Sequence, residues 1–570
     1  MIREEAEAAG RTSLRHTGQG IRFYSDDEIE VVEGPKSLRC VVPAKAGVSR
    51  VFAEVPMGDS ASFWRPSSGY ELRMPPDWSG RSDVSGILRA PFGVLHDHDG
   101  ISTVGIGVQP AEAAVSLRYG VSEESMTFVV EFTLPASEVE RSLVFDVRGG
   151  DLFQAVARLR EATRSRRAHA ISPWAAEPVY STWYAFHEAM DDASIVDEGR
   201  LARELGFGTL FLDYGWQRFG DSRYFDGCGD WVPDTVKFPD LAATVRTLQS
   251  TGLGVVLWVA PLLIGARSEL FNRLGADATV YNPNLRAHVL DPRRVEVREH
   301  VVETCLRLVQ EFGVDGLKID FIDAASAYAL AGDVETHDAI AEALVDMLAA
   351  VRAGLDDLGH PELLIEYREP YIGLALAGSG DVIRAEDCPG DFIANRRSTL
   401  DLRVLGTGQL VHSDMMMWDP ALPMATVSAL LSNATFSVPQ LSMRLGSMSE
   451  DQRSAIASWL SAWRATSRLA LHGRLTQLRP HLHYPSATAI DGDEALSVVW
   501  SADTVLAVPL EVRHATVVNG TRSTRVGVQL ARGGTVLTVD HRGAEVLAGS
   551  VAGRCFIEIP VGGRAHFTLD

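Results

Sequence analysis

The feature that most constrains the fold is an alternation of eight apolar segments with helical segments between residues 179 and 471. Apolar runs of this length are typical of strands buried on both faces, as in a parallel sheet. The eight runs are 179–183, 209–213, 254–259, 316–320, 363–366, 382–387, 409–414 and 436–440. Eight strand–helix units in about 300 residues predict an α/β fold, a (β/α)8 TIM barrel.

The helical segments between these runs are amphipathic. The clearest one precedes Gly359 and spaces its apolar residues by three or four: Ile340, Leu344, Met347, Leu348, Val351 and Leu355. Such a stripe is one helix face packed on a core, and glycine is common just beyond a helix C-terminus. We therefore expect a helix that ends shortly before Gly359.

On both sides of the barrel the pattern changes to short alternating runs, such as 127–132 and 495–500, which are typical of antiparallel strands. We therefore expect three domains. Residues 1–165 form an N-terminal β-sandwich with a linker helix, residues 170–472 form the catalytic barrel, and residues 475–570 form a small C-terminal β-sandwich.

Charge and cysteine content exclude several classes of partner. The net charge of −22, from 75 acidic and 53 basic side chains, repels phosphate backbones and anionic lipid headgroups. The five cysteines form no CxxC pair, which argues against a disulfide framework or a zinc site. The N-terminus carries charges where a signal peptide needs an apolar core, and no apolar run is long enough to span a membrane. We expect a cytoplasmic protein that binds neither nucleic acid nor membranes, with its oligomeric state left open.

The carboxyl ends of the predicted strands are rich in acidic residues, and the active sites of TIM barrels lie at this face. The acids there are Asp213, Asp320, Glu366, Asp387 and Asp414, and the neighbouring tryptophans include Trp183, Trp231 and Trp258. Indole rings can cover the C–H faces of a sugar while fixed hydrogen-bonding groups bind its hydroxyls. The pattern therefore favours a carbohydrate site.

Lys318 and Asp320 are two residues apart on one strand, and so they share a face of it. Gly316, on the same face, indicates that this is the crowded interior of the barrel. The alternative interpretation is an internal Lys–Asp ion pair with no role in catalysis.

Asp387 belongs to the acidic segment 384–391, in which Pro389 and Gly390 end the strand and leave the acids in a loop. Asp391 fits the N-cap of the following helix better than Asp387 does. Asp387, Glu386 and Asp391 all remain open as the acid of this loop.

Two carboxylic acids in one dry pocket repel, so one keeps its proton at neutral pH while the other is ionised. Glycoside hydrolysis needs that division between a nucleophile or base and a proton donor. Two other functions use the same groups. Asp320, Glu366 and Asp387 are also suitable Mg²⁺ ligands for an enolase-like lyase or racemase with Lys318 as the base. The third possibility is a catalytically inactive carbohydrate-binding protein.

At this point the chain resembles glycoside hydrolase family 36, the α-galactosidase family of clan D. The resemblance is carried by segments 211–216, 229–239 and 317–320, which read FLDYGW, GDWVPDTVKFP and LKID. In that family the nucleophilic Asp lies in a Lys-X-Asp segment on strand 4, and the acid/base Asp lies in a Ser-Asp-X-X-Asp type motif on strand 6. The resemblance implies that Asp320 is the nucleophile and Asp387 the acid/base.

Three segments depart from the family pattern. The family usually has Asp-Asp-Gly-Trp after strand 2, where this chain has Asp213-Tyr214, so we expect a loss of one hydroxyl contact and weaker galactose specificity. The Cys- and Gly-rich turn after strand 5 is replaced by residues 366–371. The acid/base loop is also altered, and we expect neighbouring carboxylates to raise the pKa of Asp387.

The sequence thus predicts a retaining α-glycosidase of the α-galactosidase type that hydrolyses an oligosaccharide or small glycoside with no metal or cofactor. Asp320 and Asp387 are the predicted catalytic residues. The predicted substrate-binding residues are Asp213, Tyr214, Trp183, Trp231, Trp258, Lys318, Glu366, Arg368, Arg384, Asp391, His412 and Asp414.

Overall fold

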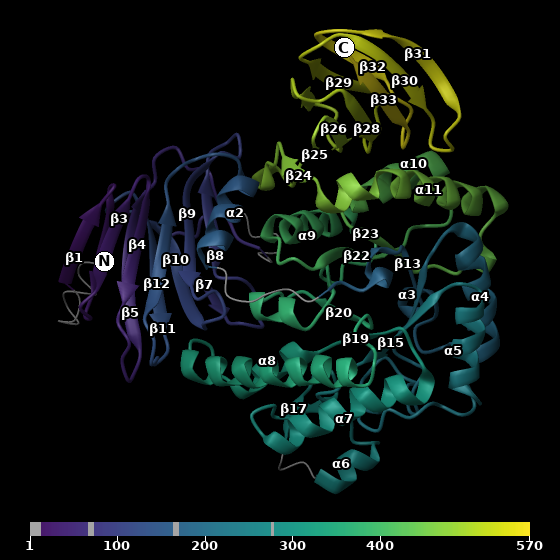
Figure 1. Ribbon diagram of the computed structural model, residues 1–570, viewed down its shortest axis with the longest axis horizontal. Coiled ribbons are helices and arrows are strands. Elements are labelled where there is room, and N and C mark those ends of the chain that lie inside the picture. The colour runs from purple at the N-terminus through teal and green to yellow at the C-terminus, as the bar shows by residue number, and fades with distance from the viewer. Residues whose placement is uncertain (1–12, 67–72, 164–169, 275–278) are drawn as a thin grey trace.

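A computed structural model describes residues 13–66, 73–163, 170–274 and 279–570. Its first part is a sandwich of two six-stranded sheets, seen at the left of Figure 1, with the strand orders β1-β2-β5-β11-β10-β7 and β3-β4-β12-β9-β8-β6. The strands are β1 (Ser13–Gly18), β2 (Ile21–Ser25), β3 (Glu30–Gly34), β4 (Ser37–Val42), β5 (Ser49–Pro56), β6 (Ser62–Trp64), β7 (Gly80–Val84), β8 (Phe92–His96), β9 (Ser102–Gln109), β10 (Val115–Ser122), β11 (Thr127–Leu134) and β12 (Arg141–Asp146). Helix α2 (Leu152–Thr163) follows and packs on β9.

Eight strands then form a closed parallel barrel, which confirms the predicted fold class. They are β13 (Val179–Ser181), β14 (Thr209–Leu212), β15 (Gly254–Val259), β19 (Gly316–Ile319), β20 (Leu364–Arg368), β21 (Val382–Arg384), β22 (Leu410–Met416) and β23 (Val438–Leu441). A three-stranded sheet is inserted after β15, from β16 (Leu263–Ile264), β17 (Val280–Asn282) and β18 (Ala287–Val289).

Helices connect the barrel strands. The α-helices are α3 (Trp183–Phe186), α4 (Asp192–Leu205), α5 (Leu241–Ser250), α6 (Glu269–Leu274), α7 (Val295–Phe312), α8 (Val334–Asp357), α9 (Phe392–Leu405), α10 (Met424–Leu431) and α11 (Glu450–His472). Short 3₁₀ helices are η1 (Pro173–Ala176), η3 (Ile322–Tyr328), η4 (Leu374–Gly378), η5 (Ser432–Ala434), η6 (Leu445–Ser447) and η7 (Pro480–Leu482). Helix α8 buries all six residues of the predicted apolar face, and Gly359 follows its end with φ +85°.

The C-terminal part, at the top of Figure 1, has a seven-stranded sheet ordered β24-β25-β26-β28-β33-β30-β31 and a three-stranded sheet ordered β27-β29-β32. Its strands are β24 (Arg474–Thr476), β25 (Ser486–Asp491), β26 (Glu494–Val499), β27 (Val505–Val508), β28 (His514–Asn519), β29 (Arg525–Leu530), β30 (Gly534–Val539), β31 (Glu545–Val551), β32 (Arg554–Glu558) and β33 (Arg564–Leu569). In the part of the chain that the structure describes, no helix has the length and apolar character needed to cross a membrane.

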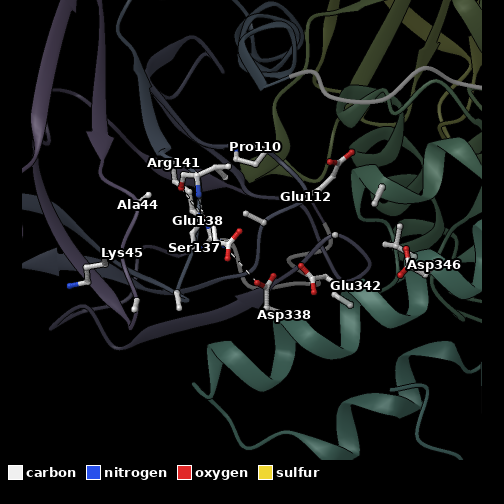
Figure 2. A pocket seen from close by; sticks show the side chains of 18 residues that line it. Ala44, Lys45, Pro110, Glu112, Ser137, Glu138, Arg141, Asp338, Glu342 and Asp346 are labelled. Carbon is white, nitrogen blue, oxygen red and sulfur yellow. Dashed lines mark hydrogen bonds and ion pairs between the residues drawn. The ribbon is translucent and has the colours of Figure 1, made fainter. Parts of the chain in front are cut away.

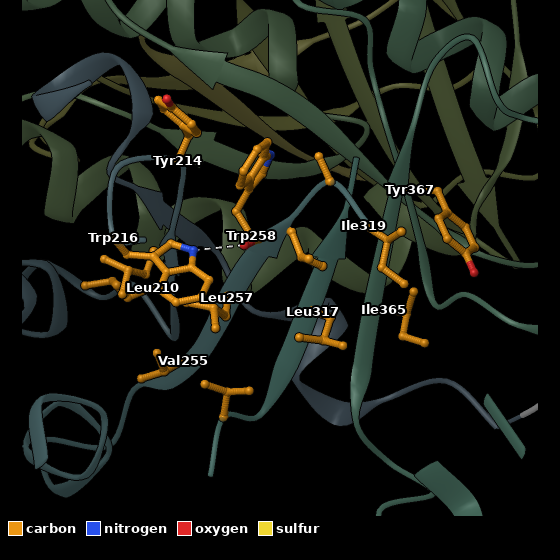
Figure 3. Packing of buried hydrophobic residues seen from close by; sticks show 14 of the residues in the cluster. Leu210, Tyr214, Trp216, Val255, Leu257, Trp258, Leu317, Ile319, Ile365 and Tyr367 are labelled. Carbon is orange, nitrogen blue, oxygen red and sulfur yellow. Dashed lines mark hydrogen bonds between the residues drawn. The ribbon is translucent and has the colours of Figure 1, made fainter. Parts of the chain in front are cut away.

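The two-residue period of the barrel strands separates outward from inward side chains. Outward residues such as Leu257, Leu317 and Ile365 pack in the apolar layer beneath the helices (Figure 3). A separate buried cluster contains one residue from each of seven barrel strands: Val179, Phe211, Val256, Leu364, Val382, Leu410 and Val438. Two residues further along, on the same faces, lie Asp213, Trp258, Glu366, Arg384, His412 and Gln440. An apolar floor therefore carries a polar layer nearer the carboxyl ends of the strands.

Candidate active site

Asp320 directly follows β19, and its carboxylate is surrounded by donors. Arg368 Nε donates to Oδ1 at 2.6 Å, Tyr371 OH lies 3.2 Å from Oδ1, and Trp258 Nε1 donates to Oδ2 at 2.9 Å. The backbone N–H of Phe321 also donates to Oδ1. Among the described residues, Oδ1 therefore accepts several bonds, whereas Oδ2 accepts from the indole alone.

These donors keep Asp320 ionised although it is only 6% exposed. Burial by itself raises the pKa of the carboxyl, but the charges of Arg368 and Lys318 and the bond from Trp258 outweigh it. The net effect holds the pKa of Asp320 well below its usual range. A buried group that stays anionic at neutral pH has the character of a nucleophile.

Lys318 lies on the predicted interior face, and its direct partner is Asp213. The Nζ to Oδ2 distance is 2.6 Å, and both side chains are buried. Burial lowers the pKa of Lys318, but the charges of Asp213, Asp320 and Glu366 together outweigh it and leave the pKa raised. The ion pair of Lys318 is therefore with Asp213 and not with Asp320, the partner that the alternative interpretation expected, and Lys318 acts on Asp320 through its charge.

Asp387 lies beyond the end of β21, in the loop that precedes α9. Its carboxylate accepts from Arg384 Nη2 at 2.7 Å, and its side chain is 54% exposed. Burial and the charge of Asp320 raise the pKa of Asp387, but the charges of Arg384 and Arg368 lower it by more, so the net shift is downward. The expectation of a raised pKa is therefore wrong for the free protein, because the guanidinium groups dominate.

Arg384 also binds Asp414, with Nη1 donating to Oδ1 at 2.6 Å. Asp414 lies inside β22 and is fully buried, and this burial raises its pKa to about 6 against the opposing charge of Arg384. Tyr184 OH and the backbone N–H of Cys388 donate to its Oδ2. The guanidinium of Arg384 thus binds both Asp387 and Asp414. The pKa of the exposed Asp387 is lowered, whereas that of the buried Asp414 is raised.

Glu366 and His412 lie deeper in the barrel and are fully buried. Gln440 Nε2 donates to Glu366 Oε2 at 2.7 Å and lies 3.0 Å from His412 Nδ1. His412 Nε2 lies 2.8 Å from the Ala175 carbonyl oxygen, which gives the ring a protein partner on each side. Direct contact of Glu366 and His412 with a substrate remains a prediction, since their described bonds are to protein groups.

Tyr214 was expected to line the sugar subsite, but its ring is 1% exposed. It packs edge-on against Trp183, Phe225 and Trp258, and its hydroxyl donates to the Tyr224 carbonyl oxygen at 2.7 Å. Figure 3 shows it beside Trp258, whose carbonyl oxygen in turn accepts from Trp216 Nε1. Tyr214 therefore supports the tryptophan that bonds to Asp320.

The remaining aromatic and acidic predictions have different surroundings. Trp231 is buried beside Trp258 with ring centroids 5.7 Å apart, and its Nε1 has no partner among the described residues. Trp183 is half-buried and contacts His187. Asp391 is exposed and caps α9 by accepting from Ala394 N at 2.9 Å, as the sequence predicted.

Sequence reasoning assigned no role to Tyr371 and Glu369, which lie in the segment that replaces the family turn after strand 5. Tyr371 reaches Asp320, and Glu369 binds the backbone of the Asp387 loop. Their signal in the sequence was their position after a barrel strand beside Arg368. Among the residues that the structure describes, no cluster of three or more His, Cys, Asp or Glu side chains has the arrangement of a metal site.

A cavity of about 1060 Å³ lies elsewhere, between the N-terminal sandwich and α8 (Figure 2). Its charged lining includes Glu112, Arg141, Asp338 and Glu342, and it contains no aromatic ring and none of the predicted site residues. Among the described residues, this cavity thus offers none of the rings or acids from which the sequence predicts a sugar site.

Comparison with known proteins finds similarity to one family and to several relatives. A family model described as Melibiase matches residues 153–366, which include Asp213, Lys318 and Asp320. Over these residues the chain is similar to the Melibiase family. Asp387 lies outside the matched residues, so its assignment rests on geometry and on the loop motif.

Two curated proteins that this chain resembles are α-galactosidase AgaA of Geobacillus stearothermophilus, 30% identical over 149 residues, and α-galactosidase 2 of Pediococcus pentosaceus, 31% identical over 150 residues. Each match covers 25% of this chain and 20% of the relative. The chain thus aligns with about a fifth of the length of these relatives.

Solved structures match over far more of the chain. The GH36 α-galactosidase AgaA of G. stearothermophilus has a TM-score of 0.62 and 16% identity, and covers 97% of this chain and 82% of its own. The α-galactosidase of Lactobacillus brevis has a TM-score of 0.63 and 13% identity, and covers 97% and 80%. At these identities the likeness shows a shared three-part fold.

Proposed function

We propose that this protein is a retaining α-glycosidase of the α-galactosidase type. The observation that carries the proposal is the pair of carboxyl groups at the carboxyl ends of β19 and β21. Asp320 is buried and held ionised, whereas Asp387 is exposed on a loop and interacts electrostatically with Asp320. Retaining hydrolysis requires such a pair, one as nucleophile and the other as acid and then base.

In the proposed first step, Asp320 attacks the anomeric carbon and forms a covalent glycosyl intermediate. Oδ2 is the attacking oxygen, because Oδ1 is already occupied by Arg368, Tyr371 and Phe321. As the carboxylate loses its charge in the bond to carbon, the donors on Oδ1 fix its orientation. In the second step water attacks the same carbon and releases Asp320.

Asp387 donates a proton to the leaving oxygen in the first step and removes one from water in the second. In the free protein the pKa of Asp387 is lowered by the charge of Arg384. The pKa of the neighbouring Asp414, in contrast, is raised by burial to about 6. A sugar bound over Asp387 excludes water from its carboxylate, and this desolvation raises the pKa toward the protonated form that the first step needs.

We propose α-galactosides as the substrates. Structures of AgaA variants from G. stearothermophilus are described in complex with raffinose and with stachyose. In this chain the buried pair Asp213 and Lys318, beside Asp320, is proposed to bind sugar hydroxyls. The indole N–H of Trp231, which has no partner among the described residues, is a further donor for them.

The test is a panel of aryl α- and β-glycosides, assayed with and without EDTA, with the first-formed product anomer followed by NMR. We expect turnover of α-galactosides, the α-anomer as the first product, and activity that persists in EDTA. A β-anomer as the first product would contradict the double displacement. EDTA-sensitive activity on a non-glycoside acid would favour the enolase-like alternative, and binding without turnover of any glycoside would favour a binding protein.

A further inference from the structure

The loop that carries Asp387 is held from both sides by buried carboxyl groups. The backbone N–H of Glu386 donates to Glu369 Oε2 at 3.0 Å. On the other side of Asp387, the N–H of Cys388 donates to Asp414 Oδ2 at 2.7 Å. The residues before and after the proposed acid/base are thus each tied to a different barrel strand.

Glu369 follows the last residue of β20 and is only 2% exposed. Its Oε2 also accepts a short hydrogen bond from Ser398 of α9, and Ser398 Oγ in turn lies 3.3 Å from the Glu386 nitrogen. Burial raises the pKa of Glu369 to about 7. The carboxyl retains lone pairs for the loop N–H in either protonation state.

Arg368 and Glu369, which are adjacent at the end of β20, therefore each contact one of the two proposed catalytic segments. Arg368 donates to Asp320, and Glu369 accepts from the loop of Asp387. A displacement of about 1 Å in a reacting group can cost on the order of a hundredfold in rate. An exposed carboxylate on a loop needs a fixed backbone to keep its position against Asp320.

We propose that Glu369 is a positioning residue for the acid/base, acting through the backbone of Glu386 and together with Asp414 on the opposite side. The inference rests on the proposed function, since it assigns Glu369 to the proton-transfer half of the reaction. The described hydrogen bonds of the Glu369 carboxyl are to the Glu386 backbone and to Ser398, and none is to the carboxylate of Asp320 or Asp387. Its loss is therefore expected to weaken proton donation more than nucleophilic attack.

The experiment compares kcat/KM for α-galactosides with a dinitrophenol leaving group, which needs no proton, and with a sugar or alkyl leaving group, which does. In Glu369→Ala we expect the second rate to fall by about 10- to 100-fold more than the first, within the range that general acid catalysis contributes. Glu369→Gln keeps an acceptor oxygen, and we expect it to restore the ratio to within about threefold of wild type.

The matched control is Asp381→Ala. Asp381 is also buried and accepts from the backbone N–H groups of Ser172 and Ile365, both at 2.8 Å, but at the opposite end of the barrel strands. We expect this variant to lower Tm without changing the ratio between the two substrates. A ratio that tracks Tm in both variants would overturn the positioning role.

If Glu369→Ala does not fold, Ser398→Ala decides, because it removes a partner of both Glu369 and Glu386 at a half-buried site. We expect the ratio to shift in the same direction, and an unchanged ratio overturns the inference. A wild-type protein that hydrolyses no glycoside refutes the proposed function. An active wild type whose variants lose both substrates equally refutes only the role of Glu369.

Discussion

Arg368 is the main group that keeps Asp320 ionised, and its removal makes a quantitative prediction. The ion pair is 2.6 Å long, with side chains 11% and 9% exposed. An adjacent guanidinium lowers a carboxyl pKa by about 1–3 units, or about 1.4–4 kcal/mol. In Arg368→Met the methylene stem is largely kept while the charge is lost. Because burial alone raises the pKa of Asp320, we expect that pKa to rise by about 1–3 units.

The assay is the pH dependence of kcat/KM on an activated aryl α-galactoside. In wild type the acidic limb lies at very low pH, since Asp320 stays ionised there. In Arg368→Met we expect this limb to move upward by about 1–3 pH units.

The free energy of unfolding depends on pH for the same reason. Because the pKa of Asp320 is lower in the folded state, its ionisation stabilises the fold above the unfolded-state pKa of about 3.9, and this stabilisation is lost as pH falls through the folded-state pKa. The Tm difference between wild type and variant is therefore largest at neutral pH and closes toward acid.

The matched control is Arg352→Met. Arg352 forms an even more buried ion pair with Asp381, 2.8 Å long, at the amino end of the strands. Its loss should lower Tm and leave the acidic limb in place. If the limb of Arg368→Met coincides with that of wild type while the variant remains folded, Arg368 does not set the ionisation of Asp320 and the electrostatic argument fails.

Four further predictions concern single side chains. Asp320→Asn should lose at least about 10³-fold in kcat with an unchanged circular dichroism spectrum, because it removes the group that acts only in the transition state. Asp387→Ala should keep glycosylation by substrates with acidic phenol leaving groups and lose it for alkyl glycosides, as measured by pre-steady-state bursts. Trp258→Phe removes a hydrogen bond to a charged group worth about 1.5–3 kcal/mol, so the acidic limb of kcat/KM should rise by about 1–2 units. Tyr214→Phe loses only the bond to Tyr224, so Tm should fall slightly while the ratio of α-galactoside to other glycoside activities stays constant; a changed ratio would place Tyr214 in contact with the sugar.

The fold could be predicted because each barrel strand is short, apolar and followed by an amphipathic helix. The two-residue period also places Lys318 and Asp320 on one inward face without any long-range information. The two-residue period of a strand does not predict which charged side chain pairs with which. Lys318 binds Asp213, 105 residues away in sequence, and that choice depends on barrel closure.

The sequence named Asp387 and Tyr214 as site residues, but it could not predict the contacts that surround them. Asp387 lies three residues beyond the end of its strand, and its loop donates hydrogen bonds to Glu369, which follows β20, and to Asp414 in β22. Tyr214 occupies a position where the resembled family has an acid, but a phenol ring gains more from packing against Trp258 than from facing a polar subsite. Substitution at a motif position therefore changes the support of the site as well as its contacts. In this barrel, the end of β20 and the residues after it supply Arg368 and Tyr371 to one acid and Glu369 to the loop of the other.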